Sequence, residues 1–434
     1  MALPDRTAVS RREYLKAAVA VGGAAGLAAC MEELGTEADA EIPHGDPSVL
    51  PERQHAWNAV LRTDDDGNDV PPKHHVLRYL DLADGVDPAD AREPLESTLT
   101  ALESAIRWGP DGLLFTLGYS PTYFSRFDES LASSVDLPEP TQLTPLEDGL
   151  ALDETDLLIH LASDRPEVLL AAEEALFDDR ETINEIEIPS LSGILEPTTE
   201  GRRTGFVGAG LPAEKQDVAG ISGDSPVPEA APFFMGYRSG FARTQATEDR
   251  VTIDDGPFAG GTTQHVSKIE LQLNAWYNQE DEFQRVAKTF SPRHAAEGLV
   301  EGVGDNLTND SKIVPEDVAD LVDSARRDGV VGHAQKAAAA REDGEPILLR
   351  RDFNTTDDDK AGVHFLSLQE TISDFVAVRE AMTGEEIADG SGVGPRLNNG
   401  ILQYLFVRRR GNFLVPPREC RSMPTPAGTT AEGQ

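Results

Sequence analysis

Apolar residues in the first half of the chain recur at two spacings, one typical of helices and the other of strands. Leu95, Leu99, Leu102 and Ile106 are three or four residues apart, which places them on one face of a helix. Short apolar runs between polar loops indicate buried strands. We predict strands over residues 55–62, 74–82, 112–119 and 156–164, and helices over residues 94–107 and 165–177. This order is close to that of a ferredoxin-like unit.

The second half of the chain repeats this rhythm, although no sequence repeat is detectable. Residues 200–228 are rich in Gly, Pro and charged residues, which indicates a long loop. Residues 266–273 alternate between apolar and polar positions, as a half-buried strand does. The elements predicted after this strand are helices over residues 276–290, 317–327 and 371–382, and strands over residues 347–349 and 363–368.

Residues 332–353 hold a single histidine close in sequence to two arginines. His333 stands on a predicted Ala-rich helix, and a short apolar strand further on ends in Arg350 and Arg351. A neutral imidazole is a good ligand for iron, and an arginine beside a metal site attracts anions. The alternative is a surface helix, a turn and two solvated arginines. The local sequence leaves both interpretations open.

The composition is strongly acidic. The chain has 77 Asp and Glu residues against 38 Lys and Arg residues, a formal net charge of −39 at pH 7. The carboxylates are spread along the chain, which argues against an acidic interaction tail. Such a surface repels nucleic acid and anionic lipid. Because molar salt shortens the screening length to about 3 Å, we interpret the dispersed charge as adaptation to high salt.

The N-terminus predicts export. Residues 10–16 match a twin-arginine motif, and a short, weakly apolar run over residues 17–29 follows it. Residues 27–30 resemble a lipobox, so we expect Cys30 to be lipidated, to become the mature N-terminus and to anchor the protein on the outer face of the cytoplasmic membrane. The alternative is an uncleaved signal anchor. Cys420 is the only other cysteine, so no disulfide is expected once Cys30 is acylated.

Two polar segments flank the expected folded body. Residues 31–52 are acidic and broken by Pro and Gly, which predicts an extended linker. Residues 421–434 are polar and predict a disordered tail.

Several blocks of the chain resemble the dye-decolorising peroxidase family. They cover most of residues 55–385, in the order and at the spacing of that family. The blocks are residues 116–119 (TLGY), 156–168 (DLLIHLASDRPEV), 260–262 (GGT), 332–333 (GH), 347–351 (ILLRR) and 361–365 (AGVHF). The histidine block is incomplete, because Gln335 stands where the family has an arginine.

This resemblance implies an α+β fold of two ferredoxin-like halves with antiparallel sheets packed on each other, as in dimeric α+β barrels. The halves would span residues 53–195 and 196–420, with haem b in the second. His333 would be the iron ligand and Arg350 the distal arginine, which stabilises negative charge on bound peroxide. Arg351 is the runner-up, because a shift of one residue in the alignment exchanges the two. The implied partners are hydrogen peroxide and a small substrate, and a homo-oligomer is possible.

One departure from the family affects the function. Residues 205–210 (GFVGAG) match the family's G-F-x-D-G signature, with Gly205 and Phe206 kept but Gly208 in place of the acid/base aspartate. These three positions would still lie at the cofactor. Because glycine moves no proton, either another group substitutes, or the protein binds or handles haem with little or no peroxidase activity. A third possibility is a surface protein without a cofactor.

Other polar residues near these blocks carry weaker signals. Asp217, Asp224 and the pair Asp254–Asp255 are close in sequence to Gly208, but nothing places them at a cofactor. His364 could face a pocket from its predicted strand. His74, His75 and His160 fall in predicted strands and are more typical of core or edge positions. His265 and His294 have no carboxylate or histidine at the spacing of metal ligands.

Overall fold

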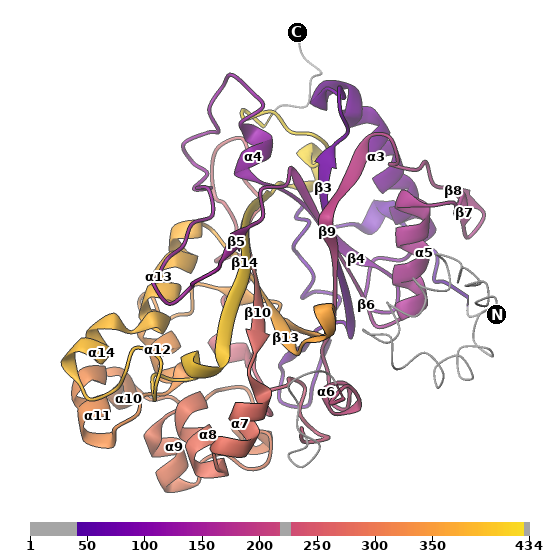
Figure 1. The fold of residues 1–434 in the computed structure, drawn as a ribbon. Helices are drawn as coiled ribbons and strands as arrows, with labels where there is room; N and C mark the ends of the chain where they lie inside the picture. The colour runs from indigo at the N-terminus through magenta and orange to yellow at the C-terminus, as the bar shows by residue number, and fades with distance from the viewer. Residues whose placement is uncertain (1–40, 218–226, 429–434) are drawn as a thin grey trace, which may run out of the picture.

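The computed structural model describes residues 41–217 and 227–428, which form two similar halves (Figure 1). The N-terminal half has the order strand, helix, strand, strand, helix, strand. Its elements are β3 (His74–Leu82), α3 (Pro88–Ala105), β4 (Leu114–Tyr119), β6 (Leu157–Ser163), α5 (Pro166–Phe177) and β9 (Leu195–Phe206). The antiparallel sheet runs β9-β3-β6-β4, which is the strand arrangement of a ferredoxin-like unit.

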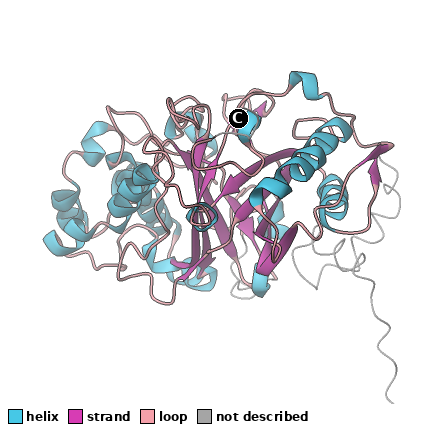
Figure 2. Cartoon of the chain, turned by 90° about the horizontal axis from the view of Figure 1, so that it is seen from above, coloured by secondary structure: helices cyan, strands magenta, loops and turns pink. Residues whose placement is uncertain are grey.

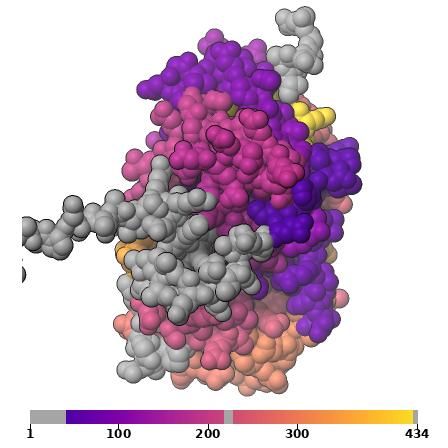
Figure 3. Space-filling model, turned by 90° about the vertical axis from the view of Figure 1, so that its right-hand side faces the viewer, coloured from indigo at the N-terminus to yellow at the C-terminus, as the bar shows by residue number. Residues whose placement is uncertain are grey.

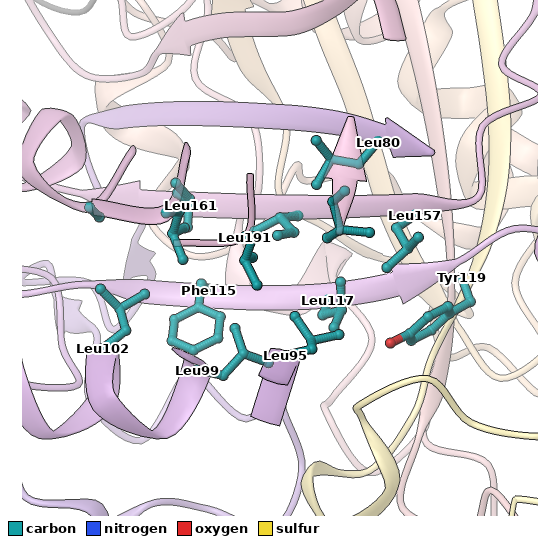
Figure 4. Close-up of a cluster of buried hydrophobic side chains, with 14 of the residues drawn as sticks. Leu80, Leu95, Leu99, Leu102, Phe115, Leu117, Tyr119, Leu157, Leu161 and Leu191 are labelled. Atoms are coloured by element: carbon teal, nitrogen blue, oxygen red, sulfur yellow. The ribbon is translucent and has the colours of Figure 1, made fainter. Parts of the chain in front are cut away.

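Helix α3 covers one face of this sheet. It begins where Asp87 accepts a hydrogen bond from the backbone N–H of Ala89 (2.8 Å) and a proline occupies the first turn. Leu95 and Leu99, on one face of the helix, pack against Phe115 and Leu117 of β4 (Figure 4). The predicted apolar stripe is therefore confirmed, although the helix begins six residues earlier than expected.

The C-terminal half repeats the same order with a helical insertion after its first strand. Its elements are β10 (Thr262–Leu271), α7 (Leu273–Gln279), α8 (Glu282–Thr289), α9 (Pro292–Glu297), α10 (Pro315–Val318), α11 (Leu321–Asp328), α12 (His333–Ala339), β11 (Leu349–Arg350), β12 (Phe353–Thr355), β13 (Gly362–Gln369), α13 (Ile372–Thr383), α14 (Glu385–Gly390) and β14 (Leu405–Val415). Its main strands run β14-β10-β13-β12, so both halves share one topology.

The two sheets join at both edges. β9 pairs with β12 at Phe206 and Asn354, and β4 pairs with β14 at Tyr119 and Leu414. Because β10 also pairs with β14, the eight main strands form a closed ring. In Figure 2 the strands lie between groups of helices. One buried cluster combines apolar side chains from β3 and β6 with those from β10 and β13. The expected α+β fold of two ferredoxin-like halves is confirmed.

Short elements complete the described chain. They are the 3-10 turns Pro47–Val49, Ala242–Thr244, Asp305–Leu307, Asp357–Asp359, Leu402–Tyr404 and Arg418–Cys420, the helices α4 (Pro121–Phe124) and α6 (Leu211–Glu214), and the strands β1 (Arg62–Thr63), β2 (Asp69–Val70), β5 (Ala151–Leu152), β7 (Thr182–Ile183) and β8 (Ile186–Glu187). None of the described helices is both long and apolar enough to cross a membrane.

Several expected elements differ from the structure. Residues 55–61 form turns, where a strand was expected. The helix expected over residues 276–290 is two helices, because Asp281 caps the start of α8. The boundary expected at residue 196 falls inside β9, whose long pairing with β3 assigns it to the N-terminal half. Strand β14 was not predicted, although its pairing with β10 is needed to close the ring.

The two flanking segments pack more closely than expected. Gly45 donates a backbone hydrogen bond to Ser104 of α3, so the body begins before residue 53. At the other end, Arg421 is 1% exposed and binds the carboxylate of Glu103, and Met423 is fully buried. Residues 421–428, which were expected to belong to a disordered tail, therefore pack against the folded body.

Figure 3 shows the side of the molecule on which segments of the N-terminal half lie above those of the inserted helices. Cys420 is a buried free thiol, whose pKa burial raises to about 12. The twin-arginine motif, the lipobox with Cys30 and Asp224 lie outside the described residues.

Candidate functional site

A cavity of about 310 Å³ lies in the C-terminal half, between the sheet and helices α12 and α13. Alternate residues of three strands face it, because successive side chains of a strand point to opposite sides. These residues are Ser267, Ile269 and Leu271 of β10, Val363 and Phe365 of β13, and Leu405 and Val407 of β14. The helical insertion after β10 contributes to the opposite wall, through Thr289, Phe290 and the residues of α12.

His333 lines the cavity from the first residue of α12. The side chain of Gln335 accepts a hydrogen bond from the backbone N–H of Gly332 (2.8 Å) and caps this helix. Neither ring nitrogen of His333 has a hydrogen-bond partner among the described residues, and Nδ1 is buried. Burial lowers the pKa of His333 to about 3, and the positive charges of Lys336 and Arg350 add to this effect. The imidazole is therefore neutral and able to bind a metal.

The face of α12 beside His333 carries only small side chains. Ala334, Ala337 and Ala338 line the cavity, at positions one, four and five residues after the histidine. Larger residues here would fill the space next to the imidazole. The Ala-rich composition, which favours a helix, thus also leaves room for a flat ligand.

Arg350 and Asp352 reach the cavity from the segment that carries β11. Their closest charged atoms are 3.9 Å apart, and Arg350 also donates to the hydroxyl of Ser239 (3.3 Å). Asp352 accepts a hydrogen bond from the backbone N–H of Leu366 (3.1 Å). Burial raises the pKa of Asp352 to about 6, against the opposing effect of Arg350. A carboxyl group with this pKa can both accept and donate a proton near neutral pH.

The other charged groups of the cavity wall are arginines. Arg379 and Arg410 are both held by the buried carboxylate of Glu147, in a loop of the N-terminal half. Arg238 and Arg341 lie nearer the surface. Within the described residues, Asp352 is the only acidic side chain of the wall. In a protein of net charge −39, the cavity is therefore a local positive region, suited to an anionic ligand.

Arg351, the alternative to Arg350, lies outside this cavity. Its guanidinium stacks on the ring of Trp57 (4.3 Å) and donates to the backbone of His55 (2.7 Å) and to Glu248 (3.0 Å). Adjacent residues of an extended segment point to opposite sides, so only one arginine can face the cavity. Arg351 therefore does not face the cavity, and its guanidinium packs against Trp57 instead.

Gly205, Phe206 and Gly208 do not line the cavity. A Cβ atom at Gly205 would lie 2.2 Å from the ring of Phe353, so this glycine allows β9 to approach β12. Phe206 packs edge-on against Phe234 of the wall (5.7 Å between ring centres) and supports it from behind. Gly208 has a φ of +131°, which disfavours a side chain there. The sequence analysis expected these three residues at the cofactor, and none of them belongs to the cavity wall.

The remaining candidates also lie elsewhere. His364 points away from the cavity, toward Phe353 and the carboxylate of Asp357 (3.4 Å). His265 and His294 are buried and hydrogen-bonded to neighbouring polar groups. Asp217, Asp254 and Asp255 are exposed. In residues 41–217 and 227–428, no three His, Cys, Asp or Glu side chains converge as they would around a metal ion.

Asp352 is the residue that the sequence analysis missed. It stands two positions after Arg350, which is the spacing of residues on one side of a strand. Once Arg350 is expected to face a cofactor, the same alternation places Asp352 beside it. The local sequence therefore carries a signal for Asp352 in its spacing from Arg350.

The fold is that of dye-decolorising peroxidases. A dye-decolorizing protein from V. cholerae superposes with a TM-score of 0.53 at 15% identity, over 85% of this chain and 99% of that one. Ferric DtpA from Streptomyces lividans gives a TM-score of 0.56 at 18% identity, over 87% and 94% of the two chains. A putative DyP-type peroxidase from Shewanella oneidensis gives 0.54 at 16% identity, over 82% and 95%. The resemblance inferred from the sequence blocks is thus confirmed in the fold.

Residues 72–417 match a family described as "Family of unknown function (DUF7405)", and the chain belongs to this family. The match includes the four main strands of each half and every cavity residue discussed above. No curated protein matches the chain.

Proposed function

We propose that this protein binds haem b in the cavity of the C-terminal half and uses hydrogen peroxide to oxidise a small substrate. The observation that carries the proposal is His333, a neutral imidazole without a partner among the described residues, in an apolar cavity that also holds Arg350 and Asp352. The similarity of the fold to dye-decolorising peroxidases supports the same function.

The residues of the cavity fit this cofactor. A nitrogen of His333 would hold the iron, and the three alanines of α12 leave space beside the imidazole for a flat ring. Aromatic and aliphatic side chains form most of the wall and suit a porphyrin. The wall arginine Arg341, whose guanidinium donates only to backbone oxygens among the described residues, suits its carboxylate groups.

Two side chains would carry the proton and charge chemistry. Haem, when bound, supplies the iron at which peroxide is reduced. The carboxylate of Asp352 would accept a proton from peroxide and return it to the departing oxygen, the task that Gly208 cannot perform. The guanidinium of Arg350 stabilises negative charge that develops on the oxygen atoms.

A second candidate function is haem binding or haem handling with little peroxidase turnover. It is favoured by Gly208, whose backbone conformation is unsuited to the aspartate of the related signature. The two functions share the cofactor and differ in peroxide-dependent oxidation.

The test uses the purified chain without its first 30 residues, titrated with ferric haem. We expect a Soret band from the native sequence and from His44→Ala, an exposed histidine, but not from His333→Ala. Absence of haem uptake by the native sequence, or an unchanged band in His333→Ala, contradicts haem binding at this site. Peroxide-dependent dye oxidation by the loaded protein then distinguishes the peroxidase from the haem-handling protein.

We also propose export by the twin-arginine route, lipidation at Cys30 and anchoring on the outer face of the cytoplasmic membrane. The motif and the lipobox support this proposal. Cys30→Ser should release the exported protein from the membrane fraction into the medium. Equal membrane retention of the two forms would contradict a lipid anchor.

A further inference from the structure

Lys336 lies one turn after His333 on α12 and is completely buried. Its ammonium group donates to the backbone oxygen of Met382 (2.6 Å), to Oδ1 of Asn399 (2.6 Å) and to the backbone oxygen of Asn399 (3.2 Å). Three acceptors match the three N–H groups of a charged lysine. The network can therefore accommodate lysine in its protonated form.

These acceptors come from two distant segments of the chain. Met382 is in the last turn of α13, where free carbonyl groups attract a cation. The side chain of Asn399 is itself held in place, because its amide donates to the backbone oxygens of Thr383 (2.9 Å) and Pro395 (3.0 Å). Lys336 thus fastens the histidine helix to α13 and to the loop before β14.

The backbone around the lysine is shaped for close contact. Gly400 has a φ of +59°, and a Cβ atom there would lie 3.2 Å from Cα of His333 and 3.3 Å from Cε of Lys336. Gly384, also with positive φ, packs in the same way on Cδ of the lysine. The backbone at Gly400 and Gly384 therefore packs directly against His333 and the aliphatic part of Lys336.

The charge of Lys336 is not neutralised locally. Among the described residues no carboxylate pairs with it, whereas the other buried lysine of this region, Lys288, binds Glu280 (2.6 Å). The charged groups that act on His333 are all cationic: Lys336, Arg350 and Arg379. Histidines that bind metals usually donate their second N–H to a carboxylate or carbonyl, and His333 has no such acceptor among these residues.

We infer that Lys336 is a positioning residue of the site, which fixes α12 and whose buried charge favours the ferrous over the ferric form of iron held by His333. The inference rests on the proposed haem binding. A nearby positive charge disfavours the more positively charged metal, and an imidazole without an anionic partner donates less electron density to it. Both effects would raise the reduction potential of the iron.

The test is a spectroelectrochemical titration of the haem-loaded protein at pH 6, below the pKa of about 7 to which burial lowers Lys336. Lys336→Met removes the charge and the anchor, whereas Lys336→Gln keeps a hydrogen-bond donor without the charge. We expect both to shift the ferric–ferrous equilibrium about tenfold toward ferric, which is about 59 mV for one electron. The control is the double variant Lys288→Met with Glu280→Gln, which removes a buried lysine together with its carboxylate partner and should change the equilibrium less than threefold.

A purely structural role for Lys336 predicts a different pattern. Lys336→Gln would then restore the native potential as well as the unfolding midpoint of the apoprotein. An unchanged potential in both Lys336 variants that retain haem overturns the inference, whereas failure of the native protein to bind haem overturns the proposed function instead. If neither lysine variant folds, Asn399→Asp decides, because it places a carboxylate against the retained lysine and should also lower the potential.

Discussion

Asp352 and Arg350 line the same cavity but differ in the chemistry that their side chains can perform. Both face the same cavity, where Arg350 supplies a guanidinium and burial raises the pKa of the Asp352 carboxyl group to about 6. One side chain is therefore a fixed charge and the other a group that exchanges protons near neutral pH. This division of roles is testable by substitutions that change one property at a time.

Asp352→Asn keeps the shape of the side chain and removes its acid/base function. We expect the turnover of peroxide-dependent oxidation to fall by about 10²–10⁴-fold. Stability at pH 7 should be unchanged or higher, because the ionised carboxylate is disfavoured in the folded protein. The measurement is steady-state oxidation beside thermal unfolding, with the exposed Asp254→Asn as control. Native turnover in Asp352→Asn would exclude Asp352 as the acid/base group.

Arg351→Ala should affect stability rather than chemistry. The substitution removes the stacking on Trp57 and leaves Glu248 without its cationic partner, so we expect a loss of about 3 kcal/mol in the free energy of unfolding. Arg350→Ala should instead leave stability nearly unchanged and slow the reaction with peroxide. Urea unfolding and stopped-flow absorbance measure the two effects, and an exchange of these outcomes would reverse the assignment.

At the scale of elements, the site depends on helix α12 and on the strands opposite it. The period of apolar residues predicted α3, α5, β3 and β6, because their burial follows a local and regular pattern. The insertion that carries α12 was recognised only in part, since its short helices end at caps and turns. The position of His333 on a helix was predicted. Only the cavity shows why the side chains beside it are small.

Ala337→Leu tests whether haem binds next to the cavity face of α12. The added side chain would enter the space beside His333, so we expect haem affinity to fall at least tenfold while the apoprotein remains folded. Ala339→Leu on the exposed face is the matched control and should bind haem normally. Absorbance titration with haem gives both affinities. Equal affinities would place the ligand away from α12.

At the scale of the whole molecule, buried histidines determine the response to acid. Burial lowers the pKa of His55 and His75 to about 3 and that of His74 to about 4, whereas each would titrate near 6.5 in the unfolded chain. Stability is therefore complete above pH 6.5 and decreases as the pH falls toward these values, by up to about 1.4 kcal/mol per pH unit for each histidine. Chemical unfolding between pH 8 and 5 measures the slope, and a flat profile would contradict it.

The net charge of −39 predicts a second property of the whole molecule. Repulsion among carboxylates opposes folding, and salt screens it, since the screening length falls from about 8 Å at 0.15 M to about 3 Å at 1 M. We expect the thermal unfolding midpoint to rise markedly between 0.15 M and 2 M potassium chloride, and sodium chloride should act alike. A midpoint independent of salt would argue against the interpretation of the charge as adaptation to high salt.

The sequence by itself determined the α+β class, most elements of the N-terminal half, and His333 and Arg350 as the best candidates. These features follow from local periodicity and from short blocks in a fixed order. The tertiary structure alone decided that β9 and β14 close the ring, that Arg351 faces Trp57, and that Lys336 fastens the helix of His333 to distant segments. The physical reason is that burial and pairing depend on partners more than forty residues away, such as Asn399 for Lys336, which no local pattern specifies.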